Sequence, residues 1–312
     1  MKRFGAVDVG TNTVLLLVAD VDDEGKLLPI HELERTTRLG RGLASTGRLH
    51  PESLTKTLET LDTYRAVCDR LGVDEIHIVG TSALREAQNG DDLVNAVERR
   101  FGLTLRTISG VEEARLSYLA VEREMGSGRP LLVLDIGGGS VEFIVGEEGS
   151  LLSVHSLSVG AVGLTETFLR SDPVTEEEFS AMTDHIIRNL ADVTLPRPTK
   201  AVGLGGTITT LSAVQEGREG FSSQEIHGTR LSRHEVDRQV VLYRARTVEE
   251  RSYIAGLPGE RADVILAGAA ILVQALSILD LEEVTVSCHG LRYGLLYAAT
   301  EDQSIEKSGK SC

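Results

Sequence analysis

One pattern occurs twice in the chain, as Val7-Asp8-Val9-Gly10-Thr11-Asn12-Thr13-Val14 and again as Leu134-Asp135-Ile136-Gly137-Gly138-Gly139-Ser140-Val141. Each copy consists of an apolar strand, an aspartate, a glycine-containing turn with a hydroxyl residue, and a second apolar strand. Asp8 and Asp135 are 127 residues apart, which is about the length of one domain. The repeat therefore predicts two copies of a unit built on a β-hairpin.

The segments around the repeat indicate an α/β protein. Apolar runs rich in Val, Ile and Leu alternate with longer segments of helical period. The clearest helix is predicted over 51–71, with Pro51 in its first turn and Gly72 as its terminator. A chain of 312 residues is too long for one ordinary compact core. We predict two α/β domains, residues 1–125 and 126–312, with a final helix that can pack back on the first domain.

Composition and charge limit the kinds of binding partner and the cell compartment that we expect. The formal net charge is −15, so the general surface repels polyanions and non-specific binding of nucleic acid is not expected. The three cysteines are scattered and form no CxxC pair, which fits a reducing cytoplasm. Asp8 interrupts any export signal, and the longest apolar run, 264–279, is short for a bilayer span and is predicted to be a core helix. We expect a cytoplasmic protein with no membrane partner.

Three glycine-containing loops are candidates for binding phosphate. They comprise Gly10, Thr11, Asn12 and Thr13; Gly137, Gly138, Gly139 and Ser140; and Gly205, Gly206 and Thr207. Glycine lets the backbone turn tightly and approach a phosphate closely, and the polar side chains of the first loop add donors. The third loop follows a predicted strand and opens a helix, whose N-terminal N–H groups form a natural anion site. Ordinary hairpin turns are the alternative interpretation of the first two.

Two acidic residues flank the second loop. Asp135 ends one predicted strand and Glu142 begins the next, so together they can hold a hard cation such as Mg²⁺, directly or through its waters. Asp8 occupies the position of Asp135 in the first copy and is a further candidate metal ligand. A bulged hairpin with two exposed acids is the alternative.

The segment Ser109-Gly110-Val111-Glu112-Glu113-Ala114-Arg115 contains a candidate catalytic acid. Ser109 and Glu112 have the spacing of a capping box, which gives Glu112 a structural role. Glu113 is rotated by about 100° around the helix, so it can face a cleft instead. The helix N-terminus favours the ionised form that a water-polarising base needs. Simple complementarity to the helix dipole is the alternative.

Arginine side chains are available to bind phosphate, since a planar guanidinium can bind two oxygens. Arg85 ends the segment Gly80 to Arg85 after a predicted strand, and Arg292 ends the segment Ser287 to Arg292. We select these two as phosphate ligands. Arg35, Arg38 and Arg41 lie in a third segment, and each of the five can equally be a surface residue. The sequence contains no HExxH pair, GxSxG elbow, GxxxxGK[ST] loop or GxGxxG fingerprint, which excludes several other site classes.

Taken together and in this order, the motifs resemble those of the exopolyphosphatase/guanosine pentaphosphate phosphatase family of the actin-like ATPase superfamily. The resemblance covers about residues 4–299 and includes Gly80 to Arg85 and Ser287 to Arg292. It implies two ribonuclease-H-like domains with an interdomain cleft in which the three loops hold phosphates. It also implies Mg²⁺ near Asp135 and Glu142, and Glu113 as the residue that positions or deprotonates water.

The expected reaction is in-line attack of water on a terminal phosphorus, with metal and backbone dipoles spreading the equatorial charge. The expected substrate is polyphosphate or pppGpp, and the sequence does not decide between them. We also expect a homodimer, and a requirement for a monovalent cation such as K⁺ is left open. Sugar or acetate kinases of the same superfamily, and nucleotide-dependent scaffolds, are the alternatives. The Ser109 to Arg115 helix favours the hydrolase, because it offers a water-activating acid and no obvious acceptor pocket.

Overall fold

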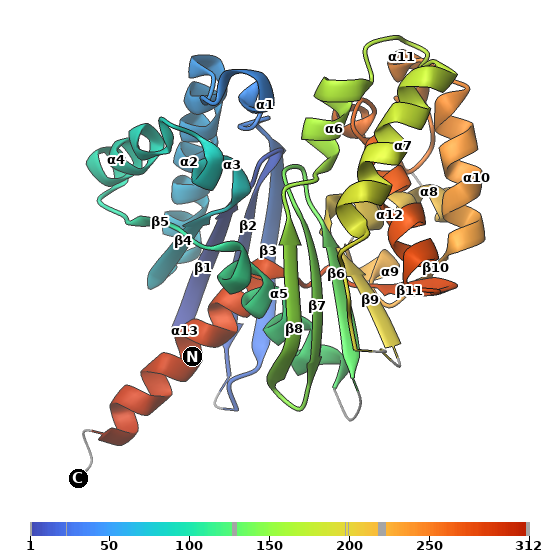
Figure 1. Ribbon diagram of the computed structural model, residues 1–312. Helices are drawn as coiled ribbons and strands as arrows, with labels where there is room; N and C mark the ends of the chain where they lie inside the picture. The colour runs from blue at the N-terminus through green and yellow to red at the C-terminus, as the bar shows by residue number, and fades with distance from the viewer. Residues whose placement is uncertain are drawn as a thin grey trace. The chain divides into compact units, whose positions relative to one another are not determined.

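The computed structural model describes residues 2–309 except 23, 127–129, 197, 199 and 218–222 (Figure 1). Its contacts divide the chain into two compact units. The first unit is Met1–Glu124 with His289–Cys312, and the second is Met125–Cys288.

The sheet of the first unit has the strand order β3-β2-β1-β4-β5. Its strands are β1 (Lys2–Val9), β2 (Thr13–Val21), β3 (Leu27–Thr36), β4 (Glu75–Gly80) and β5 (Leu105–Thr107). Strands β1, β2 and β3 form an antiparallel meander, and β4 and β5 extend the sheet in parallel from β1. The first copy of the repeated pattern is therefore the central hairpin of this sheet.

Helices cover both faces of this sheet. They are α1 (Leu43–Thr46), α2 (Pro51–Leu71), α3 (Ser82–Glu86), α4 (Gly90–Phe101), α5 (Gly110–Met125) and α13 (Leu291–Gly309). Because successive strand residues point to opposite faces, Val7 and Val9 join a core with α2 and α4, whereas Phe4 and Ala6 join one with α5 and α13. The helix predicted over 51–71 is confirmed, and it ends at Gly72 with φ 66°.

Helix α13 packs against β1 and crosses α5 closely. A Cβ atom at Gly294 would lie 1.8 Å from the carbonyl oxygen of Leu116, so only glycine permits this approach. Residues 289–312 thus group with the first unit, although they follow the second along the chain. The predicted division into domains 1–125 and 126–312, with a final helix that can pack back on the first domain, remains a prediction.

The sheet of the second unit has the strand order β10-β11-β9-β6-β7-β8. Its strands are β6 (Leu131–Ile136), β7 (Val141–Glu147), β8 (Ser150–Leu157), β9 (Lys200–Leu204), β10 (Arg230–Ser232) and β11 (Glu283–Val286). Strands β6, β7 and β8 are again an antiparallel meander, and β9 and β11 continue in parallel from β6. Except for the added edge strand β10, the order equals that of the first unit.

The helices of the second unit enclose one large core. They are α6 (Ala161–Phe168), α7 (Glu176–Leu190), α8 (Gly205–Glu216), α9 (Ser223–Ile226), α10 (Arg233–Arg244), α11 (Val248–Arg251) and α12 (Ile265–Ile278), with a 3₁₀ turn η1 (Gly259–Arg261). Helix α12 lies in the middle of this core and is the apolar helix predicted over 264–279. None of the helices in the described ranges combines the length and hydropathy of a membrane span.

The same five-strand order in both units is that of the ribonuclease-H-like fold, so the predicted α/β class is confirmed. The repeated pattern detected in the sequence is, in both units, the hairpin of the first two strands. In each unit this hairpin brings a loop to the end of the sheet at which the parallel strands also terminate, which is where α/β proteins commonly bind ligands.

Candidate active site

The first loop is a tight turn with buried polar side chains. The backbone N–H of Gly10 donates to the carbonyl of Thr13 over 3.1 Å, and a Cβ atom at Gly10 would lie 2.9 Å from that oxygen. Asn12 and Thr13 are each only 8% exposed. The Asn12 Nδ2 and Thr13 Oγ1 atoms have no hydrogen-bond partner among the described residues. Because buried polar atoms are nearly always paired, these two groups suit an anionic ligand.

The segment that follows β3 covers the backbone of this loop. The N–H groups of Thr37 and Arg38 both donate to the carbonyl of Asn12, at 3.0 and 2.9 Å, and that of Gly40 donates to Thr11 at 2.8 Å. A Cβ atom at Gly40 would lie 2.3 Å from Thr11 Cγ2. This segment therefore occupies the loop carbonyls and leaves the side-chain donors of Asn12 and Thr13 for other partners.

An ion pair joins two of the predicted site residues in the first unit. Arg85, on α3, donates from Nη1 to Glu113 Oε2 over 2.6 Å and to the carbonyl of Ile108 over 3.0 Å. The Glu113 side chain is 13% exposed and the Arg85 side chain 22%. Burial raises the pKa of Glu113 above its ordinary value, while the charge of Arg85 and its hydrogen bond act in the opposite direction.

The neighbouring glutamate has a different environment. The N–H of Glu112 donates to the Ser109 hydroxyl over 3.1 Å, as the capping-box spacing predicts, and the Glu112 carboxylate pairs with Arg106 at the surface. Two adjacent glutamates thus point to different partners, and of the two it is Glu113 that lies in a partly buried site beside an arginine.

Arg292 lies at the start of α13 and is already engaged. Its Nη1 donates to the carbonyl of Leu16 over 2.7 Å and its Nη2 to Glu32 over 3.1 Å. The hydroxyl of Tyr293 donates to the same carboxylate over 3.2 Å. These contacts attach α13 to β2 and β3. They favour a structural role for Arg292, whose predicted binding of phosphate stays a prediction.

The second loop is closed by the same backbone hydrogen bond as the first, but different elements pack against it. The N–H of Gly137 donates to the carbonyl of Ser140 over 2.9 Å. The first residues of α6 donate back to the loop, with Val162 bonded to the carbonyl of Gly138 over 2.9 Å. A Cβ atom at Gly160 would lie 2.3 Å from that carbonyl oxygen. The loop is therefore held by the backbone of a helix N-terminus.

Two carboxylates flank the second loop on one face of the sheet. Asp135 and Glu142 are directly opposite in the β6–β7 register, so both side chains project to the same side. Glu142 is 2% exposed and accepts a hydrogen bond from Ser156 over 2.8 Å. Paired carboxylate oxygens are the donor set that Mg²⁺ prefers, so these residues fit such an ion. Asp8 has Leu15 as its β2 partner and offers no equivalent pair.

The third loop lies against the end of β6, directly before the second loop. Gly205 has φ 89°, and a Cβ atom there would lie 2.7 Å from Asp135 Oδ1 and 2.5 Å from the carbonyl of Ile136. Glycine is required here for two reasons, because the backbone is left-handed and because it lies directly against the end of β6. Thr207 is 7% exposed and packs against Gly268 of α12. Within the second unit the structure therefore brings Asp135 and the third loop together.

An arginine that the sequence did not single out lies over the third loop. A Cβ atom at Gly206 would be 2.1 Å from Nη1 of Arg261, so the guanidinium rests on the glycine. Arg261 ends the η1 turn ahead of α12, two residues after Gly259 and outside the three glycine-containing loops predicted to bind phosphate. Its only sequence signal is a basic residue in a turn, which is common on any surface.

Comparison with known proteins shows the family. Residues 17–303 match the Ppx/GppA phosphatase family. The chain belongs to this family. It is 33% identical to "Exopolyphosphatase 2" of Mycobacterium tuberculosis, over 95% of this chain and 98% of the relative. A solved structure of the Aquifex aeolicus Ppx/GppA family member superposes with a TM-score of 0.82 at 34% identity, over 97% of this chain and 98% of the other.

A further relative is named for a guanosine substrate. It is the "Guanosine-5'-triphosphate,3'-diphosphate pyrophosphatase" of Photobacterium profundum, 29% identical over 94% of this chain and 58% of the relative. The resemblance and the hydrolase class predicted from the motifs are thereby confirmed.

The predicted site residues of this Ppx/GppA phosphatase are distributed over both units. The first unit holds Asp8, Gly10, Thr11, Asn12, Thr13, Arg85, Glu113 and Arg292. The second holds Asp135, Gly137, Gly138, Gly139, Ser140, Glu142, Gly205, Gly206 and Thr207. The structure pairs Arg85 with Glu113 in the first unit, and places Asp135 beside Glu142 and the third loop in the second.

Proposed function

We propose that this protein releases the terminal phosphate of inorganic polyphosphate, of pppGpp, or of both, by attack of water on the terminal phosphorus. The observation that carries the proposal is the partly buried Glu113 beside Arg85. A carboxylate in such a site can accept a proton from water, and an adjacent guanidinium can neutralise phosphate. The names of the relatives supply the two substrate candidates.

Arg85 has room to bind a phosphate without leaving Glu113. Its hydrogen bonds to Glu113 and Ile108 both come from Nη1. The Nε and Nη2 atoms have no hydrogen-bond partner among the described residues. The free edge of the guanidinium can therefore take two phosphate oxygens while Nη1 fixes the carboxylate, which couples substrate binding to orientation of the base.

We assign further groups that bind metal and phosphate to the second unit. We propose that Asp135 and Glu142 hold Mg²⁺, and separately that Asp8 is a metal ligand in the first unit. The ion would neutralise charge on the phosphate oxygens. The backbone of Gly137 to Ser140, the N-terminus of α8 and Arg261 would bind the remaining oxygens. Alongside these assignments we propose a cytoplasmic homodimer, whose subunit number light scattering would measure.

Phosphate release from three substrates tests the proposal. Purified protein with Mg²⁺ is given long-chain polyphosphate, pppGpp or ATP, with and without K⁺, and free phosphate is measured. We expect release from polyphosphate or pppGpp well above that from ATP. Transfer from ATP to acetate or a sugar without free phosphate would instead indicate a kinase. Turnover of ATP alone would indicate a nucleotide-dependent scaffold, and either result would overturn the proposal.

A further inference from the structure

A fully buried arginine lies in the second unit. Arg251, the last residue of α11, is 1% exposed. Its Nε donates to the carbonyl of Tyr243 over 2.8 Å and its Nη1 to the carbonyl of Ala262 over 3.4 Å, whereas Nη2 has no hydrogen-bond partner among the described residues. Burial lowers the pKa of the guanidinium below its ordinary value. Because burying a charge is costly, an arginine in this position calls for an explanation beyond packing.

The buried guanidinium holds the turn that carries Arg261. Ala262, which accepts from Nη1, directly follows Arg261 and caps η1. On the other side of the same turn, the Arg261 guanidinium rests on Gly206 of the third loop. One arginine therefore fixes the backbone of the turn, and the next presents its charge at the loop proposed to bind phosphate.

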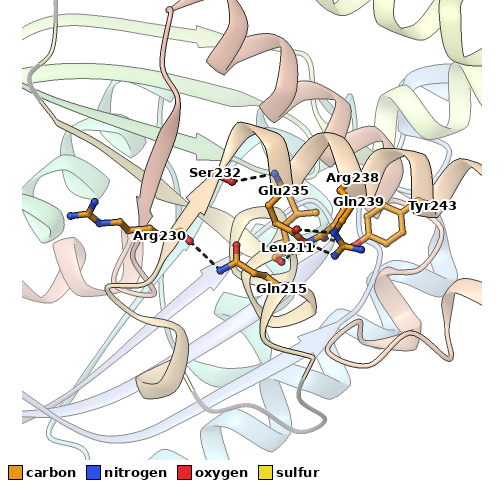
Figure 2. A network of polar contacts seen from close by, with 8 residues as sticks. All are labelled: Leu211, Gln215, Arg230, Ser232, Glu235, Arg238, Gln239 and Tyr243. Atoms are coloured by element: carbon orange, nitrogen blue, oxygen red, sulfur yellow. Dashed lines mark hydrogen bonds and ion pairs between the residues drawn. The ribbon is translucent and has the colours of Figure 1, made fainter.

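A polar network connects this turn to the helix that begins at the third loop. Figure 2 shows Gln239 of α10 between Leu211 of α8 and Tyr243. Gln239 Nε2 donates to the carbonyl of Leu211 over 2.8 Å, and the hydroxyl of Tyr243 donates to Gln239 Oε1 over 2.6 Å. The carbonyl of Tyr243 in turn accepts from Arg251. Both Gln239 and Tyr243 are fully buried, so the chain of bonds is shielded from water.

The segment between the two arginines also contacts α8 directly. Gly256 has φ 84°, and a Cβ atom there would lie 2.4 Å from the carbonyl oxygen of Ala213. The chain from α11 to η1 is thus pressed against α8 in its middle and bonded to Arg251 at its end. Its position relative to the third loop is defined at both points.

We propose that Arg251 is a positioning residue, which fixes the 259–262 turn so that Arg261 stays over the Gly205–Thr207 loop and binds substrate phosphate. This inference rests on the proposed function for its substrate. It concerns a residue that need not touch the substrate. It assigns a supporting role to the buried Arg251 and a phosphate-binding role to the partly buried Arg261.

A double-mutant cycle tests the inference. The variants are Arg251→Lys, which keeps the charge but loses the two-sided fork, Arg261→Gln, and the pair together. Michaelis constants are measured with polyphosphate and pppGpp. We expect Arg251→Lys alone to raise KM by about tenfold with a smaller change in kcat, and to change KM by less than about twofold when Arg261 is already glutamine. Equal effects in the two backgrounds would overturn the inference.

A matched variant separates positioning from stability. Tyr243→Phe removes one buried hydrogen bond from the same network but leaves the carbonyl that accepts from Arg251. We expect it to lower Tm and to leave KM unchanged. If Tyr243→Phe and Arg251→Lys raised KM equally, Arg251 would have only a structural role, and the inference would fail.

Hydrogen exchange reports on the turn without any substrate. We expect the amides of 259–264 to exchange at least about tenfold faster in Arg251→Lys, or in Arg251→Gln should the lysine variant not fold, and at the wild-type rate in Tyr243→Phe. Unchanged exchange in the arginine variants would overturn the inference. If the wild-type protein hydrolyses neither substrate but the arginine variants still exchange faster than wild type, only the proposed function is contradicted.

Discussion

The two hairpin loops have the same backbone and different chemistry. Each is closed by the same bond, from Gly10 to Thr13 in the first unit and from Gly137 to Ser140 in the second. The residue opposite the aspartate differs, because Asp8 is paired with Leu15 whereas Asp135 is paired with Glu142. The same hairpin thus places two carboxylates opposite each other in the second unit, and a carboxylate opposite a leucine in the first.

The loops also differ in the groups they offer to a phosphate. The first loop has polar side chains, with Asn12 and Thr13 buried and each holding an atom without a described partner. The second consists of three glycines and Ser140, and its carbonyls accept hydrogen bonds from the backbone of α6. The two turns therefore share a backbone geometry but differ in chemistry: the first offers side-chain donors, and the second offers backbone groups beside a carboxylate pair.

The largest expected effect concerns Glu113 of the first unit. Glu113→Gln keeps the size and the contact with Arg85 but cannot accept a proton. We expect kcat to fall by about 10²–10⁴-fold while substrate binding is retained, measured by phosphate release and equilibrium binding. Glu112→Gln is the matched control, because it loses only a surface pair with Arg106 and should cost mainly stability. Equal losses of activity from both variants would contradict the assignment of Glu113.

The aspartates of the two hairpins should differ in their effect on the Mg²⁺ requirement. Asp135→Asn weakens the pair with Glu142, so we expect the Mg²⁺ concentration for half-maximal activity to rise by on the order of 10–100-fold. Asp8→Asn makes the same change where the opposite residue is Leu15, and should shift that concentration less. Identical shifts would show that the two loops contribute alike to the metal, and the contrast between them would not hold.

The pH dependence of turnover distinguishes the units in another way. Burial raises the pKa of Glu113, and only the ionised form can act as a base, so kcat should rise with pH through a midpoint above that of an ordinary glutamate. Arg85 lowers this pKa, and therefore Arg85→Gln should move the acidic limb to higher pH. Glu142→Gln in the second unit should leave its midpoint in place. A limb that moved only with Glu142→Gln would assign the titration to the metal site instead.

Much of the fold was predictable because its signals are local. The hairpins, the 51–71 helix and the apolar 264–279 helix each follow from spacing and from glycine or proline at defined places. The candidate site was predictable where residues belong to such motifs, as Asp135 and Glu142 do. The partner of Glu113 was not, since the contact with Arg85 joins helices far apart in sequence.

The arginines show where prediction from sequence ends. Arg292 lies in the motif Ser287 to Arg292, yet its guanidinium is bonded to Leu16 and Glu32. Arg261 carries no motif and lies over Gly206. A long flexible side chain reaches several partners, and only the packing of distant elements decides which one it meets. Residue type and spacing therefore located the loops more securely than the cations around them.

The smallest expected effect tests whether the first loop binds through side chains. Asn12→Ala removes a buried amide donor. If this donor binds a phosphate, its loss should weaken the binding free energy by about 1 kcal/mol, which corresponds to roughly a fivefold rise in KM. Ser140→Ala makes the corresponding change in the second loop, where backbone groups are proposed to bind. We expect KM to change by less than about twofold there, since the backbone bond from Gly137 to residue 140 is retained. A larger rise in KM for Ser140→Ala than for Asn12→Ala would contradict this assignment. It would mean that the side chain that binds phosphate lies in the second loop, beside the carboxylate pair, and that the first loop is only a structural turn.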